Sequence, residues 1–192
     1  MYIINNTYEY VLEVNKSKFI GIVFKVNNIV DFNNMMDSIK DKYPKATHYV
    51  YAYRFINEFK SSDDGEPGGT SGMPIFNVID KEKLFNTAIV VVRYFGGIKL
   101  GAGGLVRAYS KCASNLIEDS RKSLLLEGIE CRISFKYDEI STIDNLVNSS
   151  KCRVLDKKFQ EDVQYNLIIS NDEIDKFSKY NLEKIKNTYL EI

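Results

Sequence analysis

The chain has 192 residues, of which 44% are hydrophobic, and it carries 26 basic and 26 acidic side chains. A chain of this size and apolar content can bury the core of one domain or of two small ones. The balanced charge excludes a protein that holds nucleic acid by overall positive charge, so such binding would need a local patch. There is no apolar run of about 18 residues and no signal-peptide pattern, so we expect a cytoplasmic protein.

The first part of the sequence predicts a strand, a helix and a second strand. Apolar residues alternate between positions 20 and 26, and Asn28 then opens a helix whose apolar residues follow helical spacing up to Pro44. Residues 48–55 (HYVYAYRF) alternate again, with four aromatic side chains on one face. This pattern is typical of a strand that packs on a core.

An acidic loop and a buried strand follow. The stretch SSDDGEPGGTSGMP is a loop by composition, and Thr70 or Ser71 is placed to cap a short helix with Pro74 in its first turn. Residues 87–95 (TAIVVVRYF) form a nearly continuous β-branched and aromatic run. Such a run indicates a central strand that is covered on both sides.

The next segment, RYFGGIKLGAGGLVRAY, contains five of the eleven glycines of the chain. It leads from the strand into a helix, so free backbone N–H groups and the positive end of the helix dipole would meet there and favour an anion. Arg107 and Lys111 lie four residues apart on a helix face away from the core. The predicted anion-binding or RNA-binding residues are Arg93, Gly96, Gly97, Lys99, Gly101, Gly103, Gly104, Arg107 and Lys111.

Two interpretations of this glycine segment remain open. The glycines either allow the helix to pack closely on the sheet, or they leave space for a ligand or partner. The segment is neither a Walker A loop nor a GxGxxG motif. We expect it to lie beside the acidic loop in one concave surface, with Asp63, Asp64 and Glu66 facing Arg93, Lys99 or Arg107.

The acidic loop itself has several possible roles. Asp63, Asp64 and Glu66 could hold a divalent cation, but they lack the spacing of a calcium loop, and a rigid turn with a carboxylate at a helix start is the favoured interpretation. The sequence predicts no metal site, no cofactor and no catalytic residue. We expect His48 to be a hydrogen-bonded residue at a strand end rather than a catalytic base.

The pattern changes after Asp119, and we expect two domains, residues 1–122 and 123–192, each with helices on one face of an antiparallel or mixed sheet. The second part predicts strands at 131–137, 152–158, 162–169 and 184–191 and helices at 139–149 and 171–181, the latter with a capping box of Ser170 and Glu173. This βαββαβ order is typical of a ferredoxin-like domain. The three cysteines, Cys112, Cys131 and Cys152, predict reduced core thiols.

Two motifs carry a resemblance to a known family. The stretches SSDDGEPGGTSGMPI and VVVRYFGGIKLGAGGLVRAY resemble the paired signature of the IMPACT/YigZ family, whose usual first motif reads DDGEPSGTAG. Gly68 and Ser71 therefore replace a serine and an alanine, and the second motif matches throughout. The strand at 48–54 and the stretch SKFI at 17–20 are also similar to the family, so the strong resemblance covers about residues 17–117.

The resemblance implies an α+β fold. Its first domain would be a left-handed βαβ domain like that of a small-subunit ribosomal protein and of domain IV of elongation factor G, and its second domain would be similar to domain V of that factor. The family is associated with the regulation of translation. The starvation-sensing role of eukaryotic members depends on an N-terminal RWD domain, which this sequence has no room for, so we do not expect that role.

Two main functions, and a third, simpler one, remain open at this point. The favoured one is a translation-associated protein, not an enzyme, that binds the ribosome or another structured RNA through its glycine-rich basic surface. The alternative is an enzyme or sensor for a small phosphorylated ligand or nucleotide, which the fold analogy alone supports weakly. A scaffold for a protein partner, in which the glycines serve only packing, is the third option.

Overall fold

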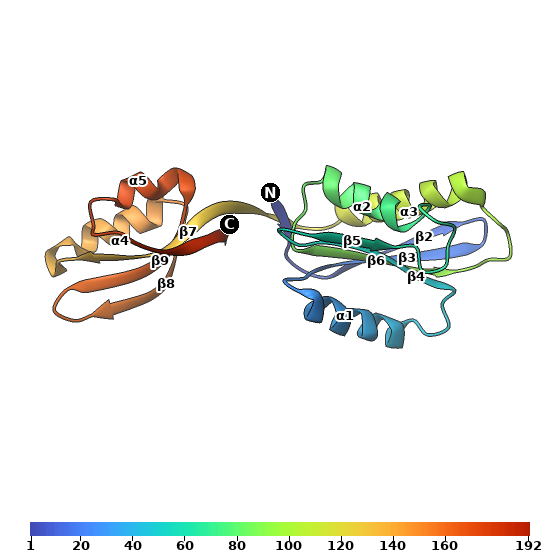
Figure 1. The fold of residues 1–192 in the computed structure, drawn as a ribbon, viewed down its shortest axis with the longest axis horizontal. Coiled ribbons are helices and arrows are strands. Elements are labelled where there is room, and N and C mark those ends of the chain that lie inside the picture. Colours follow the sequence, from blue (N-terminus) through green and yellow to red (C-terminus); the bar gives the residue numbers. More distant parts are fainter. The chain divides into compact units, whose positions relative to one another are not determined.

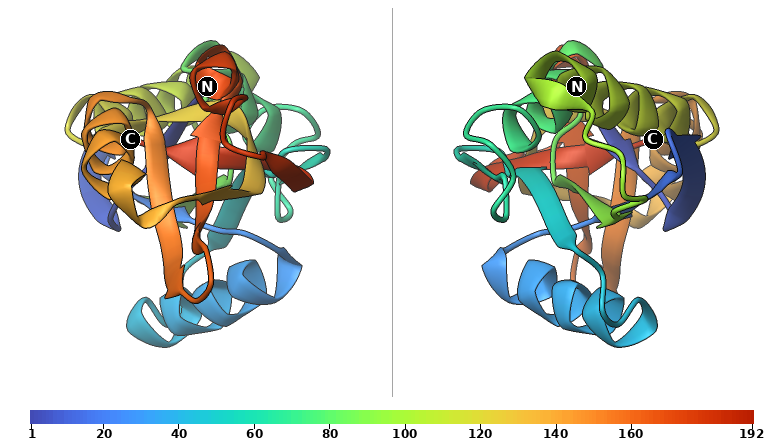
Figure 2. Two further views of the ribbon diagram at one scale, coloured as in Figure 1. Left: turned by 90° about the vertical axis from the view of Figure 1, so that its left-hand side faces the viewer. Right: turned by 90° about the vertical axis from the view of Figure 1, so that its right-hand side faces the viewer.

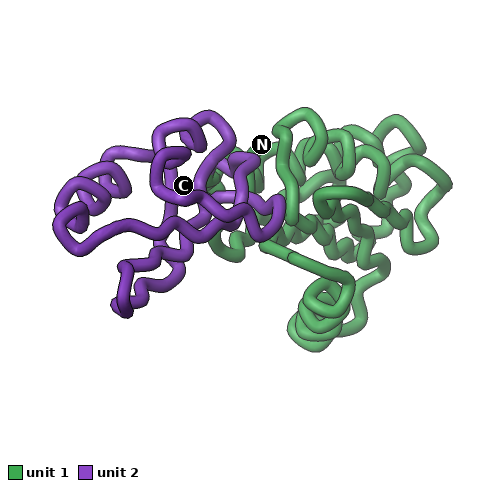
Figure 3. The backbone as a smooth tube through the Cα atoms, turned by 60° about the vertical axis from the view of Figure 1, so that its left-hand side comes forward, with its two compact units in different colours: residues 1–123 green, residues 124–192 purple.

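The computed structural model describes residues 1–192 as a mixed α/β protein of two compact units, residues 1–123 and 124–192 (Figure 3). This confirms the predicted mixed α/β class in two parts. The finer assignment of each unit to a left-handed βαβ or ferredoxin-like type stays a prediction. No helix combines the length and apolar character needed to cross a membrane.

Unit 1 is built on an antiparallel sheet with the order β2-β3-β6-β4-β5. The strands are β2 (Tyr8–Val14), β3 (Ser17–Lys25), β4 (His48–Arg54), β5 (Phe59–Ser62) and β6 (Thr87–Tyr94). A short strand β1 (Tyr2–Ile4) also belongs to this unit, and its Tyr2 bridges to Leu84. The β-branched run at 87–95 is the central strand β6, as predicted, and it delivers the glycine segment at the edge of the unit where β3 begins.

Helices cover both faces of this sheet (Figures 1 and 2). The helix α1 (Ile29–Lys42) lies on one face, and α2 (Gly72–Lys81) and α3 (Gly101–Glu118) lie on the other. The prediction of helices on one face is therefore wrong for this unit. The reason lies in β6, since Val90 and Val92 join the core under α1 while Ile89 and Val91 join the core under α2 and α3.

The start of α1 follows the prediction. Asn28 is its N-cap, and the side chain of Asn28 accepts a hydrogen bond from the backbone N–H of Asp31 at 2.9 Å. Phe32, Met36 and Ile39 are buried on one helical stripe against the aromatic face of β4. This layer closes the face of the sheet away from the glycine segment.

Unit 2 has helices on one face of its antiparallel sheet, as predicted (Figure 1). The strands run in the order β10-β7-β9-β8. They are β7 (Lys122–Phe135), β8 (Cys152–Phe159), β9 (Val163–Ser170) and β10 (Glu183–Glu191). The helices are α4 (Ile140–Ser149) and α5 (Ile174–Phe177), each after a 3-10 turn, η1 (Tyr137–Glu139) and η2 (Asn171–Glu173).

Three details of unit 2 differ from the prediction. The strand β7 begins at Lys122, whereas the sequence predicts this strand at 131–137. The helix predicted at 171–181 is a 3-10 turn followed by the four residues of α5. The predicted capping box is absent because the Ser170 hydroxyl donates to Asp172 Oδ1 at 2.5 Å, and the Glu173 carboxylate pairs with Lys176. These side chains pair with each other locally, so the turn is stabilised without a long helix.

The cysteines are free thiols, as predicted, with Cys112 and Cys131 buried and Cys152 half-buried. Burial raises the pKa of Cys112 to about 12 and the pKa of Cys131 to about 11. Burial likewise raises the pKa of Cys152 to about 11. Protonated thiols of this kind act as small apolar groups in the cores.

Candidate functional site

The acidic loop begins with a carboxylate that closes the start of α2. Asp63 Oδ1 accepts hydrogen bonds from the N–H groups of Ser71 and Gly72 at 2.9 and 2.8 Å, and Oδ2 accepts from Gly69 N–H at 2.8 Å. Burial acts to raise the pKa of Asp63, but the three N–H donors outweigh it, and the pKa lies below its ordinary value. Ser71 is the N-cap by position and makes no side-chain cap bond, so the cap comes from Asp63 instead.

Asp64 fixes the loop to strand β4. Its carboxylate accepts the backbone N–H of Tyr49 at 2.6 Å, and its carbonyl oxygen lies 2.8 Å from His48 Nδ1. Asp64 also adopts a positive φ of 44°, which starts the turn into Gly65. These bonds leave neither Asp63 nor Asp64 facing the cations of the glycine segment.

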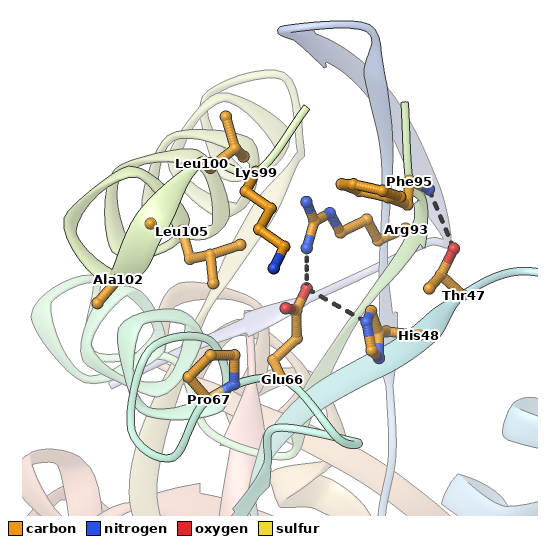
Figure 4. Close-up of a pocket in the computed structure, with 11 residues that line it drawn as sticks. Thr47, His48, Glu66, Pro67, Arg93, Phe95, Lys99, Leu100, Ala102 and Leu105 are labelled. Carbon is orange, nitrogen blue, oxygen red and sulfur yellow. Dashed lines mark hydrogen bonds and ion pairs between the residues drawn. The ribbon is translucent and has the colours of Figure 1, made fainter. Parts of the chain in front are cut away.

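Glu66 is the acidic residue that meets the glycine segment (Figure 4). Its side chain is only 4% exposed, and Oε1 accepts hydrogen bonds from Arg93 Nη1 at 2.5 Å and from the Tyr109 hydroxyl at 2.7 Å. His48 Nε2 lies 3.8 Å from the same oxygen. Burial, followed by the bond to Glu66, raises the pKa of Tyr109 well above its ordinary value, so this hydroxyl stays a donor.

Arg93 is enclosed by the same network. Its side chain is 5% exposed, Nη2 lies 3.5 Å from the Ser17 hydroxyl, and Nε is buried with no hydrogen-bond partner. The guanidinium carbon also lies 5.5 Å from the centre of the Phe95 ring. Arg93 therefore reaches the site from inside the protein, as a partner of Glu66.

A pocket of about 400 Å³ opens in front of this network. It joins the acidic loop, the end of β6 and the start of α3 in one concavity, which confirms that the two motif segments lie side by side (Figure 4). The pocket is lined by Thr47, His48, Glu66, Pro67, Arg93, Phe95, Lys99, Leu100, Gly101, Ala102 and Leu105. Its walls are mostly apolar, with ionisable groups gathered around Glu66.

The start of α3 lies at this pocket and has no cap. Leu100 occupies the N-cap position without a side-chain hydrogen bond, and the first turn contains no acidic residue. The first N–H groups of a helix have no partner within the helix, and Gly101 and Ala102, which carry two of them, line this pocket. Lys99 comes directly before this helix and points toward Glu66 in Figure 4.

The glycines of the segment have different reasons to be glycine. A Cβ on Gly96 would lie 2.0 Å from the backbone of Lys16, so Gly96 allows the β2-β3 hairpin to approach. A Cβ on Gly103 would meet only Arg107 Nη1, at the ordinary contact distance of 3.7 Å, and Gly103 has no positive φ. Packing therefore explains Gly96 and leaves Gly103 without a structural reason.

Arg107 and Lys111 lie outside this pocket. Both line a second, smaller pocket on the next part of α3, together with Asn15 of the β2-β3 hairpin. The structure thus divides the predicted set into buried Arg93, pocket-facing Lys99 and two cations further along α3.

These exposed cations share one property. Lys16, Lys99, Arg107 and Lys111, which we call the basic face, are exposed and form no ion pair in the structure. The chain also has no acidic residue from Phe95 to Ile117. The field over the start of α3 is therefore positive and not neutralised locally.

Sequence reasoning missed several members of the site. Tyr109 is one of them, and the signal that could have found it is its hydroxyl, which needs a polar partner once the ring is buried in the core. His48 contacts Asp64 and Glu66, which lie 16 or more residues further along the chain, and a local sequence pattern cannot reveal contacts over that separation. Ser17 and Thr47 support the site by accepting the N–H groups of Gly96 and Phe95.

This arrangement defines a class of protein: a two-unit α/β chain with a mixed-charge pocket beside an uncapped helix start. A family model described as the Impact N-terminal domain matches residues 15–117. The chain belongs to the IMPACT family, which confirms the resemblance of its two motifs.

Relatives extend the match to both units. The chain is 34% identical over 183 residues to the IMPACT family member YvyE of Bacillus subtilis, covering 91% of this chain and 82% of the relative. It is 26% identical over 171 residues to YigZ of Escherichia coli, covering 86% and 84%. A crystal structure of a hypothetical protein matches all of this chain and 96% of its own with a TM-score of 0.65 at 24% identity, which supports the fold.

Proposed function

We propose that this chain is a translation-associated binding protein that contacts structured RNA, of the ribosome or elsewhere, through the basic face. The observation that carries the proposal is the set of four exposed cations without ion pairs around a segment that lacks acidic residues. Phosphate contacts supply most of the affinity in such complexes, and exposed Lys and Arg make these contacts without reading sequence.

The backbone supports the same interpretation. Gly103 leaves the first turn of α3 without a side chain, although neither strain nor lack of space requires a glycine there. A phosphate oxygen can approach N–H groups closely where no Cβ intervenes, and the helix dipole favours the negative charge. Lys99 would add a charged donor at the same point.

Family membership supports the link with translation, because the resemblance to the IMPACT/YigZ family implies a role in its regulation. Glu66, the buried carboxylate nearest the pocket, is already held by Arg93 and Tyr109. That arrangement favours a binding role over general acid-base chemistry.

The test is a salt series of binding to isolated ribosomal subunits and to a duplex RNA. Four cationic contacts predict that the logarithm of the binding constant falls with the logarithm of the salt concentration with a slope of roughly −3 to −4. The double variant Lys99→Ala, Arg107→Ala should reduce the steepness of this slope by about two units. A control of equal charge is Lys40→Ala with Lys81→Ala, because these exposed lysines lie on α1 and α2. Equal slopes for both double variants, or no binding at low salt, contradict the proposal.

A further inference from the structure

The pocket beside the basic face has two chemically different parts. One part consists of Lys99 and the uncapped start of α3, and the other consists of Phe95, Pro67 and Leu105 around the Glu66 network. We infer that this pocket holds a nucleoside monophosphate unit, supplied as an unstacked nucleotide of a bound RNA or as a free nucleotide. The RNA-bound form of this inference rests on the function proposed above.

The part of the pocket formed by Lys99 and the start of α3 carries positive charge that favours a phosphate group. Arg93 and Glu66 form a buried ion pair and cancel each other, so Lys99 leaves one net positive charge in the pocket wall. The helix start adds a partial positive charge of about half a unit. This positive charge favours a phosphate group, either the diester of an RNA or the monoester of a free nucleotide, and repels an ammonium group.

The rim of the pocket offers a stacking surface for a base. The Phe95 side chain lines the pocket and is 45% exposed, so its ring is accessible to a ligand. The Arg93 guanidinium lies 5.5 Å from its ring centre and so supports the ring from within. Unstacked RNA bases are bound by such aromatic and guanidinium planes.

The inner wall offers hydrogen-bonding groups to the edge of a base. Glu66 Oε1 is occupied by Arg93 and Tyr109, but Oε2 makes no hydrogen bond within the chain. A carboxylate oxygen accepts hydrogen bonds from exocyclic amino groups of bases. Arg93 Nε, on the residue paired with Glu66, is buried and has no hydrogen-bond partner.

Calorimetry with AMP, ribose 5-phosphate and inorganic phosphate tests the inference directly. AMP should bind saturably, and ribose 5-phosphate should bind about tenfold more weakly because it lacks the stacking base. Phe95→Leu should weaken AMP about tenfold and leave ribose 5-phosphate unchanged. Equal binding of all three probes, or no AMP binding together with no pocket-dependent RNA binding, overturns the inference.

A pocket-filling variant separates this inference from the proposed function. Ala102→Trp fills the pocket from an exposed position, and Val106→Trp is the matched control on α3, because Val106 is exposed and lines neither pocket. Ala102→Trp should abolish AMP binding and reduce affinity for single-stranded RNA about tenfold, while duplex RNA binding and its salt slope persist. If Ala102→Trp binds both AMP and single-stranded RNA as the wild type does, the inference is overturned and the proposed function still stands.

The same binding measurements show whether the nucleotide is free or part of an RNA. AMP binding without RNA binding by the wild type supports the free nucleotide and contradicts the proposed function. Loss of single-strand binding in Ala102→Trp, with a thermal midpoint equal to that of Val106→Trp, supports the RNA-bound nucleotide. If Ala102→Trp has a lower thermal midpoint than Val106→Trp, the loss of binding is tested with Phe95→Leu instead. The Phe95 ring is exposed, so its removal does not open the core.

Discussion

The helices α2 and α3 lie on the same face of the sheet, yet their starts are built in opposite ways. At α2, Asp63 accepts three backbone N–H groups and closes the start of the helix. At α3, the N-cap is Leu100, the first turn has no acidic residue, and a lysine comes directly before it. The protein satisfies one helix start internally and leaves the other available to an anion from outside.

Glu66 connects these two regions, since it follows Asp63 in the loop and reaches Arg93 and Tyr109 at the pocket. The residues of the acidic loop therefore have two separate structural roles. Asp63 and Asp64 hold the loop in shape, and Glu66 positions a buried cation and a hydroxyl.

The largest effect should come from breaking the connection between the two regions. Glu66→Ala leaves the guanidinium of Arg93 buried and unpaired, which should lower the free energy of unfolding by about 3–5 kcal/mol. Urea denaturation measures this loss. The double variant Glu66→Ala with Arg93→Leu should recover part of it, and a single variant as stable as wild type would show that the pair is not structural.

Substitution of the two candidate N-cap residues, Asp63 and Ser71, tests which of them closes the start of α2. Asp63→Ala should cost about 2 kcal/mol because it removes three hydrogen bonds to a carboxylate, whereas Ser71→Ala, at the position that local rules favour, should cost about 1 kcal/mol or less. Urea denaturation at pH 7 separates the two. A larger loss for Ser71→Ala would assign the cap to the hydroxyl.

The same pair of variants has a pH dependence of known sign. The pKa of Asp63 is lowered in the folded state, so its stabilisation is complete above the unfolded value of about 3.9 and disappears as pH falls through the lower folded value. The stability gap between wild type and Asp63→Ala should be constant above about pH 5 and shrink below about pH 4. A gap that stays constant down to pH 2 contradicts the assignment.

The open start of α3 can be closed by substitution. Gly103→Asp places a carboxylate in the first turn of α3, so that a negative charge lies at this helix start as the Asp63 carboxylate lies at the start of α2, and it should weaken binding of AMP and RNA about tenfold at low salt. Gly103→Asn is the control with the same shape and no charge. Equal binding by the two variants would show that charge at this helix start does not govern the site.

The smallest effect concerns Gly103 itself. Gly103→Ala should raise the free energy of unfolding by about 0.5–1 kcal/mol, because alanine favours the helix and the added Cβ meets no close atom. Binding should weaken a few-fold as the Cβ screens the N–H groups. A variant that gains stability and keeps full affinity would indicate that the glycine has no role in binding.

Much of the fold could be predicted from periodicity and capping residues. The central strand β6, the Asn28 cap and the strand order of unit 2 along the chain follow from patterns within about ten residues. The helices on both faces of unit 1 were missed, although the doubly buried pattern of β6 already required two covered faces. The short α5 was missed because the bond between Ser170 and Asp172 competes with the expected capping box.

The site was harder to predict because its decisive contacts are long-range. The sequence identified the two motif segments and the cations, and the structure brings Glu66 and Arg93 together across 27 residues. It could not show that Arg93 is buried or that Arg107 and Lys111 line a different pocket. Nor could it show that Asp63 caps a helix that begins nine residues later, because capping rules consider only adjacent positions.

The most direct test of the open helix start is a titration followed by the backbone amide signals of the glycines. With AMP or a short single-stranded RNA at low salt, the account predicts shifts at Gly101, Gly103 and Gly104 and none at Gly72, whose N–H is held by Asp63. The shifts at Gly101 and Gly104 should be lost in Gly103→Asp, and all three should be kept in Lys40→Ala. Unperturbed α3 amides in the presence of bound ligand, or equal shifts at Gly72, would contradict the account.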